Sequence, residues 1–276
     1  MDHFLRPGLR FEVLDSGPAD APAVVLLHGF PQQPSAFDAV TSRLNAEGLR
    51  TLVPSQRGYR RAARPTRRRD YRPTVTVGDV IALLDTAGLA QAHIVGHDWG
   101  GSQAWGAAGW YPDRVASMTV LSIPHPAAFF RALRTSKQGL LSWYMLLFQL
   151  PAVPESLVAR TLAKSLRDSG LPDEYVNRYA AAMSEPGALT GALNWYRGIP
   201  FALRPPLGRI TVPTSLIWGS NDPALARTSV ELTADYVAGP YELVELDAGH
   251  WLPETEPDAV AAGILARVRS APAPTP

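Results

Sequence analysis

The sequence of 276 residues contains no cysteine. This absence excludes disulfide bonds, thiolate metal ligands and a cysteine nucleophile, and it gives no sign of an oxidising or a reducing compartment. Lysine is nearly absent as well, since Lys137 and Lys164 are the only two, and arginine supplies the rest of the 26 basic residues. With 25 acidic residues the formal net charge is +1, which provides no overall attraction to nucleic acid or to an acidic membrane.

Long apolar runs are missing too. The longest, Leu140 to Pro151, is too short to span a bilayer and is interrupted by Ser142 and Gln149. Residues 1–17 lack the apolar core of a secretory signal peptide. These absences predict a cytoplasmic protein without a membrane span, and they leave the oligomeric state open.

Charge is concentrated in one place only. Eight arginines lie between Arg57 and Arg72, in a segment that Pro65 interrupts. We interpret this segment as a solvated surface loop and not as a site for nucleic acid, because arginine is the default basic residue of the whole chain.

What is present is an alternation of short β-branched runs with longer helical segments. This pattern is typical of βαβ units and predicts an α/β protein with a mostly parallel sheet flanked by helices. Functional loops are expected after the carboxyl ends of the strands. Strands are expected at residues 11–17, 23–29, 50–55, 92–98, 117–123, 215–220 and 241–247, and helices at 76–88 and 99–110.

The alternation stops between about Pro124 and Pro206, where the residues are helical, apolar and often aromatic. We interpret residues 124–206 as an inserted helical cap. Residues 1–123 and 207–276 would then form one α/β core.

A turn flanked by glycines follows the expected strand at 92–98. Gly96-His97-Asp98-Trp99-Gly100 has the form of a nucleophile elbow, in which small residues allow a strained junction between strand and helix. The residue at the centre is an aspartate, and the helix that follows would stabilise its negative charge. Asp98 is therefore the candidate nucleophile, and the alternative is a tight turn with a helix-capping aspartate.

The other members of a catalytic set follow in the order nucleophile, acid, histidine. Asp222 and His250 each come just after an expected strand, and Asp247 is the alternative acid. Upstream, His28-Gly29-Phe30 also follows a strand, so the backbone N–H groups of Phe30 and Trp99 are candidate oxyanion-hole donors.

With these motifs in place, the chain resembles the epoxide hydrolases of the α/β-hydrolase fold. The segments "HGFP", "RGY", "GHDWGG", "WGSND" and "GHW" occur in the order of that family. The resemblance implies two cap tyrosines, which correspond to Tyr144 in "YMLLFQLP" and Tyr196 in "LNWYR". One departure is "PSQRGY", since relatives often carry an acidic residue before the Arg-Gly-Tyr.

The chemistry of an epoxide fits these residues. Asp98 would displace the ring oxygen at carbon, while the phenols of Tyr144 and Tyr196 supply a proton. His250, supported by Asp222, would then activate water to hydrolyse the resulting ester and release a vicinal diol. The expected partners are a small lipophilic epoxide and water, with no cofactor and no metal. The residues expected to line the substrate site are Phe30, Trp99, Trp143, Phe148 and Trp195.

Two other functions remain open at this point. A haloalkane or haloacid dehalogenase shares the aspartate elbow, but haloalkane dehalogenases typically place asparagine at the position of Phe30, and the tyrosine pair would be unexplained. A non-catalytic ligand-binding protein on the same fold would be expected to have lost a triad member. A serine esterase is disfavoured by Asp98.

Overall fold

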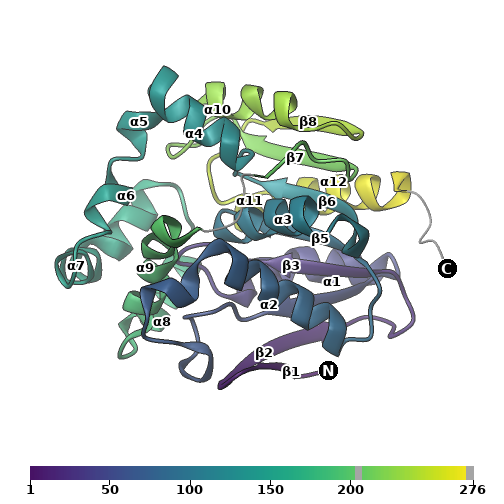
Figure 1. The fold of residues 1–276 in the computed structure, drawn as a ribbon, viewed down its shortest axis with the longest axis horizontal. Helices are drawn as coiled ribbons and strands as arrows, with labels where there is room; N and C mark the ends of the chain where they lie inside the picture. Colours follow the sequence, from purple (N-terminus) through teal and green to yellow (C-terminus); the bar gives the residue numbers. More distant parts are fainter. Residues whose placement is uncertain (203–206, 272–276) are drawn as a thin grey trace.

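The computed structural model describes residues 1–202 and 207–271, in which eight strands form one sheet (Figure 1). Their order is β1-β2-β4-β3-β5-β6-β7-β8, with β1 and β2 antiparallel to their neighbours and the other pairs parallel. The strands are β1 His3–Arg6, β2 Leu9–Ser16, β3 Ala23–Leu27, β4 Arg50–Pro54, β5 Ala92–His97, β6 Val115–Leu121, β7 Thr214–Gly219 and β8 Tyr241–Leu246.

All seven expected strands are confirmed, and β1 is an addition. It has only four residues and pairs with β2 through the register Arg6↔Leu9. A strand of four residues is too short to show an alternation of polar and apolar residues in the sequence. It becomes recognisable only through its pairing with β2.

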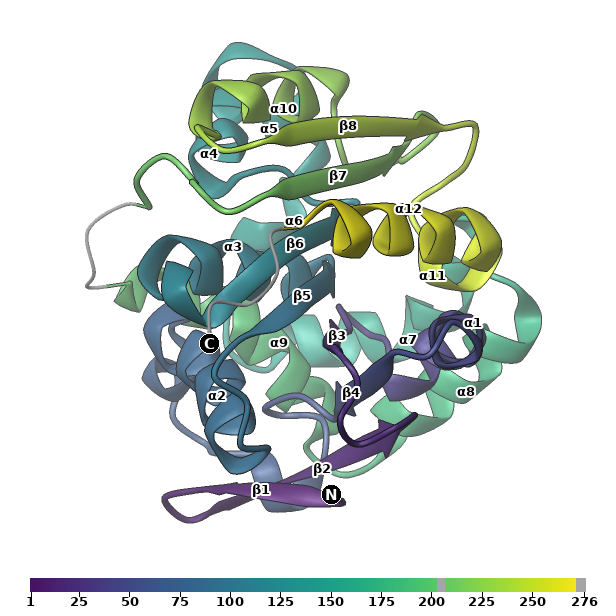
Figure 2. The same cartoon turned by 90° about the vertical axis from the view of Figure 1, so that its right-hand side faces the viewer.

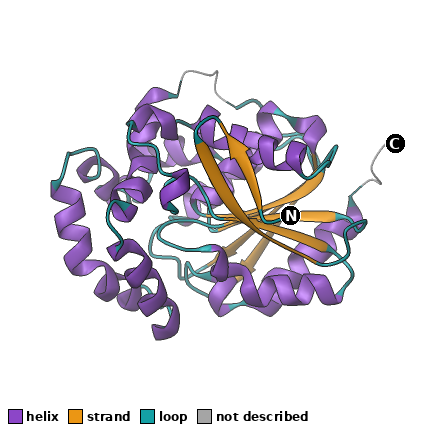
Figure 3. Cartoon of the chain, turned by 90° about the horizontal axis from the view of Figure 1, so that it is seen from below, coloured by secondary structure: helices purple, strands orange, loops and turns teal. Residues whose placement is uncertain are grey.

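Helices cover both faces of the sheet, which explains why the central strands β3 to β7 are buried along nearly their whole length and why β3 is apolar at every position. Val24 and Leu26 belong to the core on the side of α1 (Asp38–Ala46) and α12 (Pro257–Ser270). Their neighbours Val25 and Leu27 face the opposite core. That core is built by α2 (Pro73–Thr86) and α3 (Trp99–Trp110). Figures 2 and 3 show helices on both faces of the sheet.

The segment between β6 and β7 is helical, and it contains no strand in its described part. Its helices α6 to α9 gather on the left of Figure 1. By contrast, α4 packs against α10 (Arg227–Glu231) and the 3-10 helix η6. Residues 203–206, at the end of the expected cap, lie outside the described residues. The helices are α4 Pro126–Thr135, α5 Gln138–Leu141, α6 Tyr144–Leu147, α7 Val153–Asp168, α8 Asp173–Ser184 and α9 Ala188–Gly198.

Short helical turns complete the described chain. One of them, α11 (Leu252–Thr255), follows β8 and leads into α12. The 3-10 helices are η1 Pro34–Phe37, η2 Arg61–Ala63, η3 Arg68–Tyr71, η4 Pro112–Arg114, η5 Ile199–Phe201 and η6 Leu232–Tyr236. None of the helices in residues 1–202 and 207–271 has the length and apolar character needed to cross a membrane.

The structure corrects the interpretation of the arginine-rich segment, residues 57–72, as a merely solvated loop. Arg57 is buried and pairs with Asp79 through two hydrogen bonds of 2.7 Å. Arg64 donates to the Pro186 carbonyl at 2.7 Å, and Arg68 donates to that of Gln149 at 3.0 Å. A guanidinium has five donors on a long side chain, and Arg64 and Arg68 use theirs to connect the core to the helical insertion.

Candidate active site

The elbow holds Asp98 at the junction of β5 and α3 with φ at 50°, in the left-handed region that side chains rarely adopt. The flanking glycines permit this turn. A Cβ on Gly96 would lie 2.2 Å from the Gly100 carbonyl oxygen, and a Cβ on Gly100 would lie 2.0 Å from that of Leu27. Both positions therefore require glycine, and the strained turn presents Asp98 at the amino end of α3.

Two backbone N–H groups converge on the Asp98 carboxylate. The N–H of Phe30, just after β3, donates to Asp98 Oδ1 at 2.8 Å, and the N–H of Trp99 also binds the carboxylate. Burial raises the pKa of Asp98, while His250 and these two N–H groups favour its anion. The N–H groups of the two predicted oxyanion-hole donors therefore both bind the Asp98 carboxylate.

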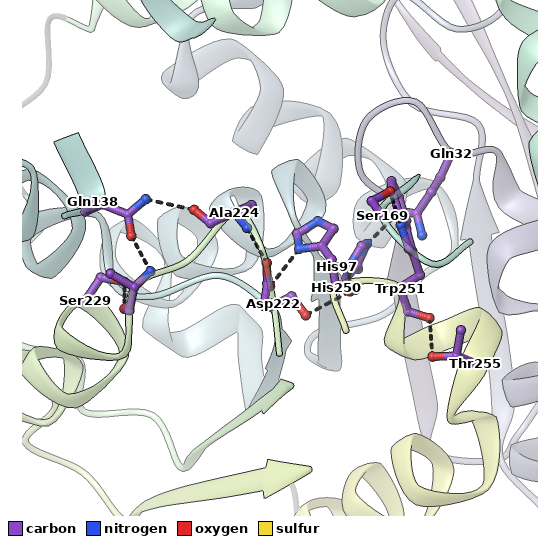
Figure 4. A network of polar contacts seen from close by, with 12 residues as sticks. Gln32, His97, Gln138, Ser169, Asp222, Ala224, Ser229, His250, Trp251 and Thr255 are labelled. Atoms are coloured by element: carbon purple, nitrogen blue, oxygen red, sulfur yellow. Dashed lines mark hydrogen bonds and ion pairs between the residues drawn. The ribbon is translucent and has the colours of Figure 1, made fainter. Parts of the chain in front are cut away.

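The histidine and the acid meet across the ends of β7 and β8. His250 Nδ1 lies 2.8 Å from Asp222 Oδ2, and both residues are buried (Figure 4). Burial alone would lower the pKa of His250, but the charges of Asp222 and Asp98 raise it to about 9. The alternative acid, Asp247, instead accepts a hydrogen bond from Asn221 Nδ2 at 2.9 Å near the surface. Asp222 is thus the carboxylate that orients His250.

The two tyrosines come from different helices and lie close together. The ring centroids of Tyr144 on α6 and Tyr196 on α9 are 6.0 Å apart. Tyr196 also packs against Trp99, with centroids 4.8 Å apart. Burial raises the pKa of both phenols, and the nearby charge of Asp98 raises it further. Both phenols therefore carry their protons at neutral pH.

Aromatic side chains surround this group. Phe148 lies with its ring centroid 6.3 Å from Phe30, and Trp195 lies 5.9 Å from Trp99. Trp143 does not join them: its side chain is 62% exposed, and it makes no ring contact within the described part of the chain. Of the five expected lining residues, the structure brings four together.

A buried polar network behind His250 was not expected from the sequence. His97 Nε2 lies 2.9 Å from the His250 carbonyl oxygen, and Nδ1 lies 2.8 Å from Gln32 Oε1. Gln32 Nε2 and the Tyr179 hydroxyl both donate to Glu254 Oε1 at 2.8 Å. Burial raises the pKa of Glu254 to about 7.

The sequence signal for this network was weak. Gln32 lies in "HGFPQQP" and Glu254 in "HWLPETEP", so both are polar residues inside recognised motifs. Their contacts join segments 222 positions apart, which no local pattern reveals. Within the described ranges, no group of three or more His, Asp or Glu side chains gathers in a way that could hold a metal ion.

Comparison with known proteins agrees with this geometry. The family model for the alpha/beta hydrolase fold matches residues 22–257. The chain belongs to the α/β-hydrolase fold family. Relatives within that family include epoxide hydrolases: the chain is 34% identical over 268 residues to human Epoxide hydrolase 4, covering 92% of this chain and 74% of that protein.

Two further comparisons cover almost the whole chain. Epoxide hydrolase A of Mycobacterium tuberculosis is 31% identical, with 94% of each chain covered. The crystal structure of Epoxide Hydrolase A from Mycobacterium thermoresistibile is 29% identical with a TM-score of 0.84, and 98% of each chain is covered. The resemblance seen in the sequence motifs is confirmed.

Proposed function

We propose that this protein hydrolyses a small lipophilic epoxide to a vicinal diol through an ester on Asp98. One observation carries the proposal: the Asp98 carboxylate lies between two N–H donors, within electrostatic reach of two protonated tyrosines. The names of the relatives agree with this activity. The residues proposed to line the epoxide site are Phe30, Trp99, Phe148 and Trp195.

In the first step an oxygen of Asp98 attacks one epoxide carbon, and the bond from that carbon to the ring oxygen breaks. Tyr144 and Tyr196 bind the ring oxygen, and one of them transfers its proton to it. The product is a hydroxyalkyl ester of Asp98 together with a tyrosinate. Residues 124–206 act as the cap that brings these phenols over the nucleophile.

In the second step His250 Nε2 takes a proton from water, and the hydroxide attacks the ester carbonyl of Asp98. Asp222 orients the imidazole through Nδ1. The N–H groups of Phe30 and Trp99 stabilise the tetrahedral oxyanion. Collapse of the tetrahedral intermediate breaks the bond to the diol oxygen, which takes the proton held by His250, and the diol leaves. The carboxylic acid of Asp98 then gives its proton to the tyrosinate, which restores the enzyme.

A single turnover in heavy-oxygen water, with enzyme in excess over styrene oxide, tests this mechanism. The label is expected in the Asp98 carboxylate and not in the diol, because the first oxygen transferred comes from Asp98. In the His250→Gln variant the peptide that contains Asp98 is expected to gain the mass of one substrate. The Tyr144→Phe/Tyr196→Phe double variant tests the first step, because without the two phenols it is expected to form no adduct.

Two outcomes would contradict the proposal. Label that enters the diol directly, without an adduct in the His250→Gln variant, would make Asp98 a base for direct attack by water. Release of halide from a short haloalkane, without turnover of the epoxide, would favour a dehalogenase.

A further inference from the structure

Ser122, the residue directly after β6, is buried in an unusual conformation. Its φ is 52°, in the left-handed region, and it is 1% exposed. A serine adopts this conformation only when the surrounding contacts impose it. Outside glycine, the described residues adopt a positive φ at only two other positions, Asp98 and Ala152.

The end of β6 contacts the backbone of both reacting residues. The carbonyl of Leu121, the last residue of the strand, accepts the N–H of Asp98 at 3.2 Å. One residue later, the hydroxyl of Ser122 donates to the carbonyl of His250 at 3.0 Å. The N–H of Ser122 donates to the carbonyl oxygen of Ile217 on β7 at 3.0 Å, and this bond anchors the turn in the sheet.

His250 lies in a loop, since β8 ends at Leu246 and α11 begins at Leu252. Its carbonyl oxygen has three partners: Ser122 Oγ, His97 Nε2 at 2.9 Å and the N–H of Leu252 at 3.0 Å. The Leu252 contact is local to the loop, so only the two side-chain contacts tie His250 to other elements. Both side chains belong to residues next to the elbow, one on β5 and one after β6.

We propose that Ser122 is a positioning residue: its hydroxyl fixes the His250 loop relative to Asp98, so that the imidazole is aligned for attack of water on the ester. The strained turn directs this hydroxyl toward the loop while the preceding carbonyl holds the elbow. The inference rests on the proposed function, because only the second step of that mechanism uses His250.

Ser122→Ala and Ser122→Gly test the role of the hydroxyl. Both remove it, but glycine also relieves the backbone strain. Loss of one neutral hydrogen bond is expected to slow ester hydrolysis by about tenfold in both variants. Formation of the ester, measured by rapid quench, is expected to stay within about twofold of wild type, since Asp98 keeps its own contacts.

The steady state gives a second readout of the same step. When the second of two steps slows and becomes limiting, the ester accumulates, so kcat and KM are expected to fall together while kcat/KM is kept. A general loss of structure would instead lower kcat/KM. Ser229→Ala is the matched control, because Ser229 is also buried and donates to a backbone carbonyl, that of Ala226 at 2.7 Å, away from His250.

The outcomes separate the two proposals. An Asp98 ester in the wild-type enzyme, with hydrolysis at the wild-type rate in Ser122→Gly, would overturn the positioning role alone. Equal slowing of both steps, or the same slowing of hydrolysis in Ser229→Ala, would also overturn it. Absence of any ester in wild type would contradict the proposed function before the variants are compared.

Discussion

At the scale of single residues, the charge of Asp98 raises the pKa of His250, the base proposed to activate water for hydrolysis of the Asp98 ester. Burial favours neutral His250, but the carboxylates of Asp222 and Asp98 raise its pKa to about 9. In the proposed ester Asp98 has no charge, so one of these two anions is lost. The pKa of His250 then falls, and more of the imidazole is neutral near pH 7, when a base is required.

The variant Asp98→Asn mimics this loss of charge in the free enzyme. We expect its His250 pKa to lie clearly below the wild-type value of about 9, as measured by NMR titration of the imidazole. Asp247→Asn is the control, since this exposed carboxylate binds Asn221 and not His250. A His250 pKa that is equal in Asp98→Asn and wild type would show that the charge of Asp98 does not raise it.

At the scale of helices, one buried guanidinium joins the elements that carry the tyrosines. Arg197, near the end of α9, donates to the carbonyls of Phe148 and Leu150 beyond α6, at 2.8 and 2.7 Å. It also binds both carboxylate oxygens of Glu155 on α7, at 2.6 and 2.9 Å. Since α6 has only four residues, these contacts hold it beside α9.

We expect Arg197→Met to lower the free energy of unfolding by about 3 kcal/mol, because it leaves Glu155 and two carbonyls without their donor. Ester formation should also slow, since the spacing of Tyr144 and Tyr196 relaxes. Urea unfolding and single-turnover kinetics measure the two effects. Arg160→Met, at an exposed position of α7, should change neither. If Arg197→Met is destabilised but forms the ester at the wild-type rate, Arg197 stabilises the fold without setting the spacing of Tyr144 and Tyr196.

At the scale of the whole molecule, the helical insertion meets the core through direct backbone contact. A Cβ on Gly191 of α9 would lie 2.3 Å from the carbonyl oxygen of Gly58, in the loop that follows β4. Beside this contact, Trp195 Nε1 donates to the Arg57 carbonyl at 2.8 Å. The position of α9, and with it Tyr196, depends on this close approach.

Gly191→Ala is expected to push α9 away from the core loop. Alanine favours a helix by about 1 kcal/mol over glycine, so any loss of stability must come from the clash, for which we expect about 1–3 kcal/mol. We also expect kcat for styrene oxide to fall, because Tyr196 moves with the helix. Gly208→Ala is the control, since a Cβ there meets no atom of residues 1–202 and 207–271 within 4 Å. Unchanged activity and stability in Gly191→Ala would show that the position of α9 does not depend on the close contact between Gly191 and Gly58.

The sequence by itself determined the parts of the protein that local patterns encode. Seven strands follow from β-branched runs, and the signal is strongest in β3 to β7, because a strand buried on both faces is mostly apolar along its length. The elbow at Asp98 follows from its glycines, which the close backbone approach requires. His250 followed from the order of the motifs, while the roles of Tyr144 and Tyr196 came from the family resemblance.

The tertiary structure alone decided what depends on contacts between distant segments. Trp143 lies among four-residue helices, too short for a periodic pattern to define an inner face, and its orientation toward solvent depends on how α5 and α6 pack. Arg57 is buried because Asp79, on α2, lies opposite it. Ser122 and Glu254 acquire their contacts only when the strand order brings the ends of β3, β5, β6 and β8 together.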